Sequence, residues 1–434
     1  MKVIEASAIR VRRASASQPD DRSSVLAYLI LLCGLLMFGV LAFGAVEVWS
    51  TSILEICAAL LFTVMVAHRL CISGVPVKRN SLYLPMLGFA SIAALQLALN
   101  LTAYRYETLL VCLQYSAYGM LFFVAAQIAD DERSCKILVL TLSLFGSAVA
   151  LFAICQNLSS TLLIYWLRAP STAASIFGPY VNHNHYAGLM ELLTPVALVL
   201  SLSSVLPGGQ RVLAAFAAIL MAGSIVLSLS RGGTLALLFE LPVLFYMVSR
   251  FQSGTLAQIR VLLLVGAILA FIGFIGSPAM WQHLGHLQDV LRLDILKDSL
   301  KMVRQKPILG WGLGTFPDVY PAFRSFYTAF FINAAHNDYM QLLVETGFVG
   351  FACAIWFVAT LYRSGLREIH NSQQGWREIL RVATLVGCTG TLVHSFFDFN
   401  LQVPANAALF FVFCAFATSL PANTEKIALK PVRI

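Results

Sequence analysis

Long apolar segments recur along almost the whole chain, separated by short polar stretches. Most are close to the roughly 20 residues that one helix needs to cross the hydrocarbon core of a bilayer. They are continuous, whereas strands of a membrane barrel alternate between polar and apolar residues over about ten positions. The pattern predicts twelve transmembrane helices, at residues 25–46, 52–70, 82–100, 108–128, 137–157, 186–206, 212–229, 232–249, 260–277, 339–361, 381–397 and 405–420. The expected fold class is therefore all-α, a polytopic integral membrane protein.

The composition agrees with this class. Of the 434 residues, 59% are hydrophobic and 12% are charged, against about 25% charged residues in a soluble domain. The nine cysteines lie within or beside apolar segments and form no CxxC pair, so we interpret them as small apolar helix residues rather than disulfides or metal ligands. The net charge of +8 is explained by basic cytoplasmic segments, and no nucleic-acid partner is expected.

The distribution of basic residues predicts the orientation. With the N-terminus in the cytoplasm, the predicted cytoplasmic segments contain all but nine of the 29 lysines and arginines. Six of those nine lie in one long loop, which can translocate regardless of its charge. We therefore expect a multi-pass protein of the cytoplasmic (inner) membrane, with a polar cytoplasmic tail at 1–24, nine helices over 25–277, a periplasmic loop at 278–338, three helices over 339–420 and a cytoplasmic tail at 421–434.

The long loop is predicted to contain structure of its own. Within residues 286–306 a stripe of leucine and valine recurs at near-helical spacing, with charges between its members: Leu287, Leu291, Leu296, Leu300 and Val303. This spacing predicts an amphipathic helix lying against the membrane or the bundle. A proline at 307 ends it, and glycines at 310, 312 and 314 predict an irregular turn. A loop of this length with its own helix is typical of a functional lid.

Arg231 lies in SLSRGG, between two apolar segments joined by almost no loop. An arginine near a helix end in the membrane is costly unless it is paired or hydrated. It either snorkels to phospholipid headgroups or clamps an anion, because a guanidinium suits phosphate and the glycines at 232 and 233 let a ligand approach the backbone. Arg292 and Arg324 lie in the long loop, where solvated surface charge is the default, less so for Arg292 on an otherwise apolar helix.

His336 lies in NAAHNDYMQLLVETG, where the long loop re-enters the membrane. An isolated histidine at a membrane interface is often only a tolerated amphipathic residue. Here, however, polar residues crowd the start of an apolar helix and need partners if they are buried: Asn333, Asn337, Asp338, Gln341 and Glu345. These residues predict a polar pocket at the outer face, in which His336 could act as a general base.

The stretch FGPYVNHNHYAGLMELLTP contains His183, His185 and Glu191. Two histidines at i and i+2 on an extended segment can ligate a metal, but no third ligand is obvious, so no metal is expected and a polar mouth above a helix is favoured. Glu191 lies inside an apolar segment and is a functional candidate for that reason. Farther on, HSFFDFN contains His394 and Asp398, and Asp398 could orient a histidine or pair with an arginine.

These motifs together resemble the O-antigen ligase and O-antigen polymerase superfamily. The matching stretches are SLSRGG at 228–233, the amphipathic helix leading to KPILGWGLGTF at 306–316, AHNDYMQLLVETG at 335–347 and HSFFDFNLQVPANA at 394–407. The resemblance covers roughly residues 175–410, and the first five helices match only in topology. The GWGLG stretch lacks the GxGxxG spacing and follows a helix rather than a strand, so it does not indicate a dinucleotide cofactor.

The resemblance implies an inverting, metal-independent glycosyltransferase without a cofactor, which takes a glycan from an undecaprenyl diphosphate donor on the periplasmic face. It implies that Arg231 and Arg292 bind the diphosphate and that His336 activates the acceptor, which could be a glycan or a lipid A-core-like molecule. Arg292 is the less secure match because an arginine recurs nearby at 304. Around these three we expect Asn337, Asp338, His183, His185 and Asp398 to line the substrate site.

Two other functions remain open from the sequence. A transporter of a small anion or other solute could use the same basic groups as an entry site, although transporters tend to contain internal repeats and midplane charges. A non-catalytic scaffold for polysaccharide export is the second alternative, and clustered polar residues disfavour it. Ligase and polymerase members share these motifs, so the acceptor, the sugars and their linkage are not predicted.

Overall fold

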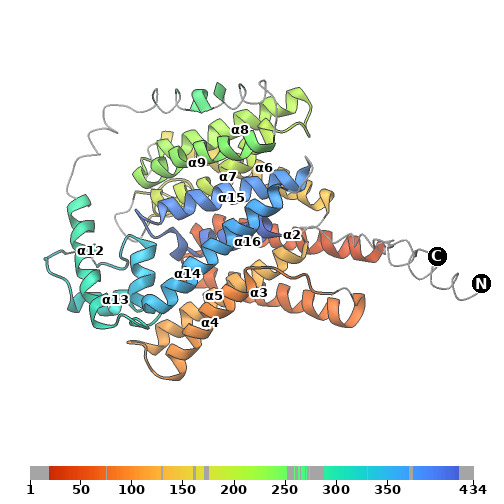
Figure 1. Cartoon of the computed structure of the whole chain (residues 1–434). Helices are drawn as coiled ribbons and strands as arrows, with labels where there is room; N and C mark the ends of the chain where they lie inside the picture. Colours follow the sequence, from red (N-terminus) through yellow and green to blue (C-terminus); the bar gives the residue numbers. More distant parts are fainter. Residues whose placement is uncertain are drawn as a thin grey trace, which may run out of the picture.

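The computed structural model describes residues 19–74, 76–128, 131–159, 163–170, 175–251, 288–329, 331–370 and 375–419, with a few isolated positions between 259 and 273. Within these ranges the chain is helical, and extended backbone pairs only at two isolated bridges, Ile164 with Arg168 and Phe177 with Tyr180. The helices form one bundle (Figure 1).

The longer helices fall into two groups along the chain. The first group comprises α2 (Pro19–Leu41), α3 (Val48–His68), α4 (Tyr83–Ala98), α5 (Arg105–Ile128), α6 (Glu132–Leu158), α7 (His183–Leu202), α8 (Gly208–Leu227) and α9 (Arg231–Phe251). The second comprises α12 (Gln288–Gln305), α13 (Phe316–Val319), α14 (Asp338–His370), α15 (Trp376–His394) and α16 (Pro404–Thr418). Short helical turns connect them at η1 (Phe43–Ala45), η2 (Arg69–Ser73), η3 (Tyr320–Ala322) and η4 (Asn400–Gln402).

The predicted apolar segments coincide with these helices, except that the segment at 260–277 lies largely outside the described residues. Eight described helices are long and apolar enough to cross a membrane, and α4 and α16 are shorter apolar helices. The chain is therefore an all-helical, multi-pass membrane protein. The helix α15 is not among these candidate spans, since it contains several polar side chains, and nearly all of it is buried in the protein.

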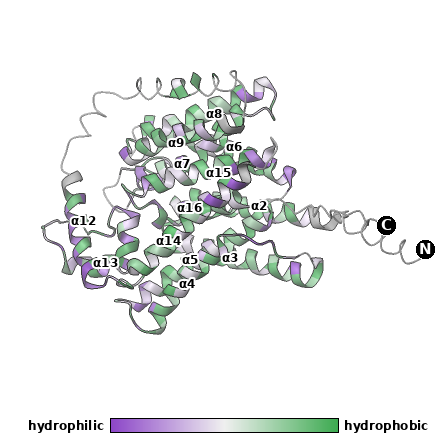
Figure 2. Cartoon of the chain, in the orientation of Figure 1, coloured by the Kyte–Doolittle hydropathy of each residue, from purple (hydrophilic) through white to green (hydrophobic). Residues whose placement is uncertain are grey.

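The centre of the bundle consists of α7, α15 and α16. Every residue of α7 from Tyr186 to Leu202 is buried, and nearly all of α15 and α16 is buried as well. The helices α8 and α9 pack on one side of this centre, and α5 packs against α16. In Figure 2 hydrophobic residues dominate the bundle helices, while hydrophilic residues gather at helix ends and around α12 and α13.

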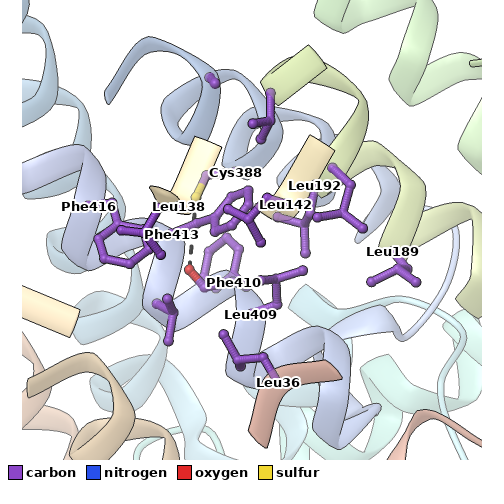
Figure 3. Close-up of a cluster of buried hydrophobic side chains, with 14 of the residues drawn as sticks. Leu36, Leu138, Leu142, Leu189, Leu192, Cys388, Leu409, Phe410, Phe413 and Phe416 are labelled. Atoms are coloured by element: carbon purple, nitrogen blue, oxygen red, sulfur yellow. Dashed lines mark hydrogen bonds between the residues drawn. The ribbon is translucent and has the colours of Figure 1, made fainter. Parts of the chain in front are cut away.

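Side chains from several helices interdigitate in this centre, as Figure 3 shows for Leu36, Leu138, Leu142, Leu189, Leu192, Cys388, Leu409, Phe410, Phe413 and Phe416. Lipid tails are as apolar as leucine, so close packing rather than exclusion of water holds helices together inside a membrane. Small residues make that packing possible. A Cβ added to Gly387 would lie 2.8 Å from the carbonyl oxygen of Leu192, so α15 rests directly on the backbone of α7.

The long loop folds at one end of the bundle, whereas α2 begins at the other end (Figure 1). The predicted amphipathic helix is present as α12. Of its predicted apolar stripe, Val303 is buried, Leu291 and Leu300 are 39% and 41% exposed, and Leu287 lies outside the described residues. The face of α12 that is buried in the protein contains Ile295, Met302 and Val303. These three pack with the residues around α13 and with the start of α14 in a second, smaller hydrophobic core: Phe316, Tyr320, Ala335 and Val344.

A glycine turn after α12 attaches the loop to α14. The glycines at 310, 312 and 314 all have positive φ, as the irregular turn predicted there requires. Opposite them α14 is broken at Gly347, whose φ of 64° and ψ of −170° are not helical. The amide of Phe348 donates to the carbonyl of Pro307 at 2.8 Å, and the amide of Gly312 donates to the carbonyl of Glu345 at 2.9 Å. The break in α14 thus supplies the backbone groups that hold the turn.

Candidate functional site

Asp398 lies just after α15 and is 1% exposed. One of its carboxylate oxygens is 3.3 Å from Nδ1 of His336, and the other accepts a hydrogen bond of 2.5 Å from the Asn184 amide. Nη2 of Arg292 lies 3.8 Å from the carboxylate oxygen that accepts from Asn184. Burial alone would raise the pKa of Asp398, but the hydrogen bond from His336 and the charges of the nearby histidines and Arg292 hold it well below its ordinary value. The carboxylate is therefore a permanent negative charge.

His336 is the residue that precedes α14 by two positions. Its φ of 50° is unusual for a residue with a Cβ, and such conformations persist only where the surroundings impose them. Those surroundings are the buried alanine before it, whose amide donates to Oε1 of Gln341 at 2.9 Å, and the ring of Phe399, whose centroid lies 5.1 Å away. The imidazole is 29% exposed, so it faces Asp398 on one side and remains accessible.

Arg292 lies near the start of α12 and reaches back to the bundle. Its Nη1 donates to the carbonyl of Phe397 at 2.9 Å, one residue before the carboxylate that Nη2 approaches. The two other loop arginines considered from the sequence behave differently, because Arg304 and Arg324 are exposed. Of these three arginines, only Arg292 has a described contact with Asp398 and its neighbour Phe397.

The first residues of α14 join that helix to the segment after α15. Asn337 donates from Nδ2 to the carbonyl of Phe396 at 2.9 Å and accepts at Oδ1 from the amide of Met340. Asp338 accepts from the hydroxyl of Ser395 at 2.9 Å and from a backbone amide in η4. The predicted polar pocket is thus a network in which Asn337 and Asp338 fix the backbone on both sides of His336 and Asp398.

The two histidines at the start of α7 do not point to a common ligand. The extended segment that a metal site would need is not present, because α7 begins at His183 and Asn182 caps it by accepting the amide of Asn184 at 2.9 Å. Nδ1 of His183 contacts the carbonyl of Ser228 at 2.6 Å, whereas the ring of His185 lies 4.8 Å from that of Phe399. Within the described ranges no three His, Cys, Asp or Glu side chains are grouped as metal ligands.

Arg231 is the first residue of α9 and is partly buried. The helix starts after Leu229, whose φ is 60°, and the hydroxyl of Ser230 caps it by accepting the amide of Gly233 at 3.1 Å. A Cβ added to Gly232 would lie 3.1 Å from Cβ of Phe397. The start of α9 therefore lies against the same residue whose carbonyl binds Arg292.

Two features of this region were missed in the sequence. The ring of Phe399 lies 4.8 Å from that of His185 and 5.1 Å from that of His336. In the sequence, only its position next to Asp398 pointed to this role. Glu240 is fully buried in α9, and neither of its carboxyl oxygens has a hydrogen-bond partner among the described residues. An acidic residue within the apolar sequence LLFELPVLF was a detectable signal, since ionisable side chains inside a membrane are rare.

The fold and this site define a class, a multi-pass helical membrane protein with a polar centre at one end of its bundle. Residues 216–355 match the family model described as O-antigen ligase. This match contains Arg231, Arg292 and His336, and it confirms the resemblance to the O-antigen ligase and polymerase superfamily, which implies a membrane enzyme of glycosyltransferase type acting on lipid-linked glycans. Asp398 and the α7 histidines lie outside the matched residues. The comparison with curated proteins gave no match.

Proposed function

We propose that this protein transfers or polymerises glycan from an undecaprenyl diphosphate donor at the periplasmic face of the inner membrane. Arg231 and Arg292 bind the donor diphosphate, and His336 activates the hydroxyl of the acceptor. Asp398 holds His336 and Arg292 in place, while His183, His185, Asn337 and Asp338 shape the substrate site around them. The acceptor is a glycan or a lipid A-core-like molecule.

The donor half of the proposal rests on the guanidinium group of Arg292, which donates to the carbonyl of Phe397, and on the first turn of α9, which carries Arg231 and packs against the same residue. Arg231 comes from the N-terminus of α9, where the helix dipole also favours negative charge. Arg292 comes from α12 in the loop, and its side chain is 35% exposed, so it can exchange part of its contact with Asp398 for a ligand. Arginine binds phosphate oxygens in pairs and stabilises the charge that develops on a diphosphate leaving group.

The acceptor half rests on the orientation of His336. Because Nδ1 faces the Asp398 carboxylate, Nδ1 carries a proton when the imidazole is neutral, and Nε2 is left to accept one. In the reaction the acceptor oxygen forms a bond to the anomeric carbon of the donor, and the bond from that carbon to the diphosphate oxygen breaks. The hydroxyl proton passes to Nε2 of His336, undecaprenyl diphosphate leaves, and the anomeric configuration inverts.

One observation carries this proposal. The carboxylate of Asp398 connects His336 and Arg292, at 3.3 Å and 3.8 Å, although the two residues belong to different parts of the loop. A base for the acceptor and a cation for the leaving group are thereby held at one place. Proton transfer and stabilisation of the leaving group are the two requirements of a displacement at an anomeric carbon.

The test is glycan transfer by the full chain in proteoliposomes, with a lipid-linked oligosaccharide as donor. We expect Arg231→Ala, Arg292→Ala and His336→Ala each to lower the transfer rate by about 100-fold or more. Arg304→Ala is the matched control, because Arg304 is on the same helix as Arg292 but is exposed. Full activity of both Arg231→Ala and His336→Ala would contradict the site assignment.

The alternative, a transporter of a small anion, receives no support from the bundle interior. Among the described residues buried where α7, α9 and α15 meet, Glu191 and Glu240 are carboxylic acids, and the imidazole of His394 is already hydrogen-bonded to Glu191. Carboxyl groups repel an anion or at best leave it unbound. Uptake of a labelled anion into proteoliposomes, lost in Arg231→Ala, would favour transport over transfer.

A further inference from the structure

A hydrogen-bonded pair of ionisable side chains, Glu191 and His394, lies where α7, α9 and α15 meet. Nδ1 of His394 is 2.7 Å from Oε1 of Glu191, and the two side chains are 1% and 0% exposed. The second carboxyl oxygen of Glu191 is buried and has no hydrogen-bond partner among the described residues. Apolar residues of similar size usually pack at such a site at no loss of stability, so stability alone does not explain this pair.

The pair supports the first turn of α9. A Cβ added to Gly232 would lie 2.6 Å from Nε2 of His394, and a Cβ added to Gly233 would lie 3.1 Å from Oε1 of Glu191. The first distance is shorter than real Cβ atoms make, and the second is close to the lower limit of ordinary Cβ contacts. The two glycines after Arg231 therefore let the backbone of α9 rest directly on the imidazole and the carboxylate.

This contact fixes the position of the arginine. Residues 231–233 form the first turn of α9, and a shift of that turn moves the Cα of Arg231 with it. The bond between Nδ1 of His394 and Glu191 determines the ring orientation, because an imidazole held at one nitrogen cannot rotate away from Gly232. The same ring is the last residue of α15, four positions before Asp398, so it connects the arginine end of α9 to the segment that binds Arg292.

We propose that Glu191 and His394 are a positioning pair, which holds the N-terminus of α9 so that Arg231 meets the donor diphosphate. The inference rests on the proposed function, because it gives Arg231 the diphosphate as its ligand. The pair touches neither donor nor acceptor. Its loss acts through the placement of Arg231, so it weakens donor binding and leaves acceptor binding unchanged.

The test compares Glu191→Ala, which removes the acceptor of the hydrogen bond, with Glu191→Gln, which keeps an oxygen at the same place. We expect Glu191→Ala to raise the KM for the lipid-linked donor and the Kd for undecaprenyl diphosphate at least 10-fold, with the acceptor KM changed less than twofold. Glu191→Gln should restore both values to within about threefold of wild type. Gly232→Ala, which inserts a methyl group against the imidazole, should reproduce the donor defect if Glu191→Ala does not fold.

Glu240→Ala is the matched control, since Glu240 is also a buried glutamate but lies within α9 against Gly390 rather than under Arg231. Hydrogen exchange of residues 231–236 should be faster in Glu191→Ala than in Glu240→Ala. Faster exchange with unchanged donor KM and diphosphate Kd would overturn the positioning role, as would an equal rise of donor and acceptor KM. A wild-type chain that neither binds undecaprenyl diphosphate nor transfers glycan would overturn the proposed function, and this inference with it.

Discussion

A single carboxylate, that of Asp398, holds side chains from three separate parts of the chain. Asn184 comes from α7, Arg292 from α12 and His336 from the residues before α14. Each of these residues is polar, and Arg292 also donates to the backbone carbonyl of Phe397. The site therefore depends on the charge of Asp398 more than on its volume.

Asp398→Asn tests this dependence because it removes the charge and keeps the shape. We expect the rate of glycan transfer to fall at least about 10-fold, since His336 loses the carboxylate that orients it. Because the pKa of Asp398 is held well below its ordinary value by His336 and Arg292, its carboxylate stays ionised in the neutral range, and the acid limb of the wild-type pH profile arises from another group. The profile of kcat/KM against pH, measured for wild type and for the asparagine variant, checks both statements. An unchanged profile and rate would exclude Asp398 from the mechanism.

Among the elements, α12 and its loop form a folded unit that attaches to α14 at two places. One is the small core around Met302 and Phe316, and the other is the glycine turn at the break in α14. Asp298 provides a third link within the loop, because its buried carboxylate accepts from Lys301 at 2.7 Å and from the amide of Ser325 at 2.8 Å. Each link can be tested separately.

The Asp298 link should be sensitive to acid. Burial raises the pKa of Asp298, but the hydrogen bonds from Lys301 and Ser325 outweigh it, and the net pKa is lowered. The stabilisation is therefore fully present above the unfolded value of about 3.8 and is lost as the pH falls through the folded pKa. Pepsin cleavage of residues 320–326 should rise over that range in wild type. Asp298→Asn should be cleaved readily at every pH tested, because it loses roughly 1.5–3 kcal/mol per charged hydrogen bond.

The glycine link should fail when Gly347 is replaced by alanine. A Cβ there would collide with the carbonyl oxygen of Ile308, and the combination of φ 64° and ψ −170° is essentially restricted to glycine, which adds strain of about 1–3 kcal/mol. We expect a lower Tm and faster hydrogen exchange over residues 307–314. Gly74→Ala is the control, because Gly74 has a φ of 60° but no atom within 4 Å of the added Cβ. Equal effects of the two substitutions would mean that backbone strain alone, not the contact with the turn, is responsible.

For the whole molecule, the function is tested in cells that lack the gene, complemented with wild type or with His336→Ala. Single repeat units that accumulate on the lipid carrier or acceptor would identify a polymerase, and full-length polymer stranded on the carrier would identify a ligase. The His336 variant should resemble the deletion, because the proposed base contributes about 100-fold or more to the rate. A glycan profile that is unchanged in every fraction would contradict glycan transfer.

The sequence predicted the membrane class and most helices because the length and apolar character of a spanning segment are set by the bilayer. It did not predict which helix faces meet protein. Lipid and protein interiors are equally apolar, so neither the complete burial of α7 nor the central place of α15 could be read from its residues. The same limit applies to α12, where the sequence does not distinguish Ile295, which is buried in the protein, from Leu291, which is exposed.

The site was predicted in part for a different reason. Polar residues at the outer ends of apolar segments stand out, so Arg231, Arg292, His336 and Asp398 were all named from the sequence. Their pairing could not be predicted, because it depends on how α12 folds back to the end of α15. The two histidines of α7 were misplaced because Asn182 starts the helix earlier than the apolar pattern indicated.

The small core shared by α12, α13 and the start of α14 has a consequence for exchanging parts between related enzymes. Met302 and Val344 belong to one packed cluster, so the natural unit of exchange ends after the glycine at 347 rather than where the loop enters the membrane. A chimera that joins at 337 would pair one parent's loop with the other parent's packing surface. A junction beyond 347 would transplant the loop with the helical turns on which it is built.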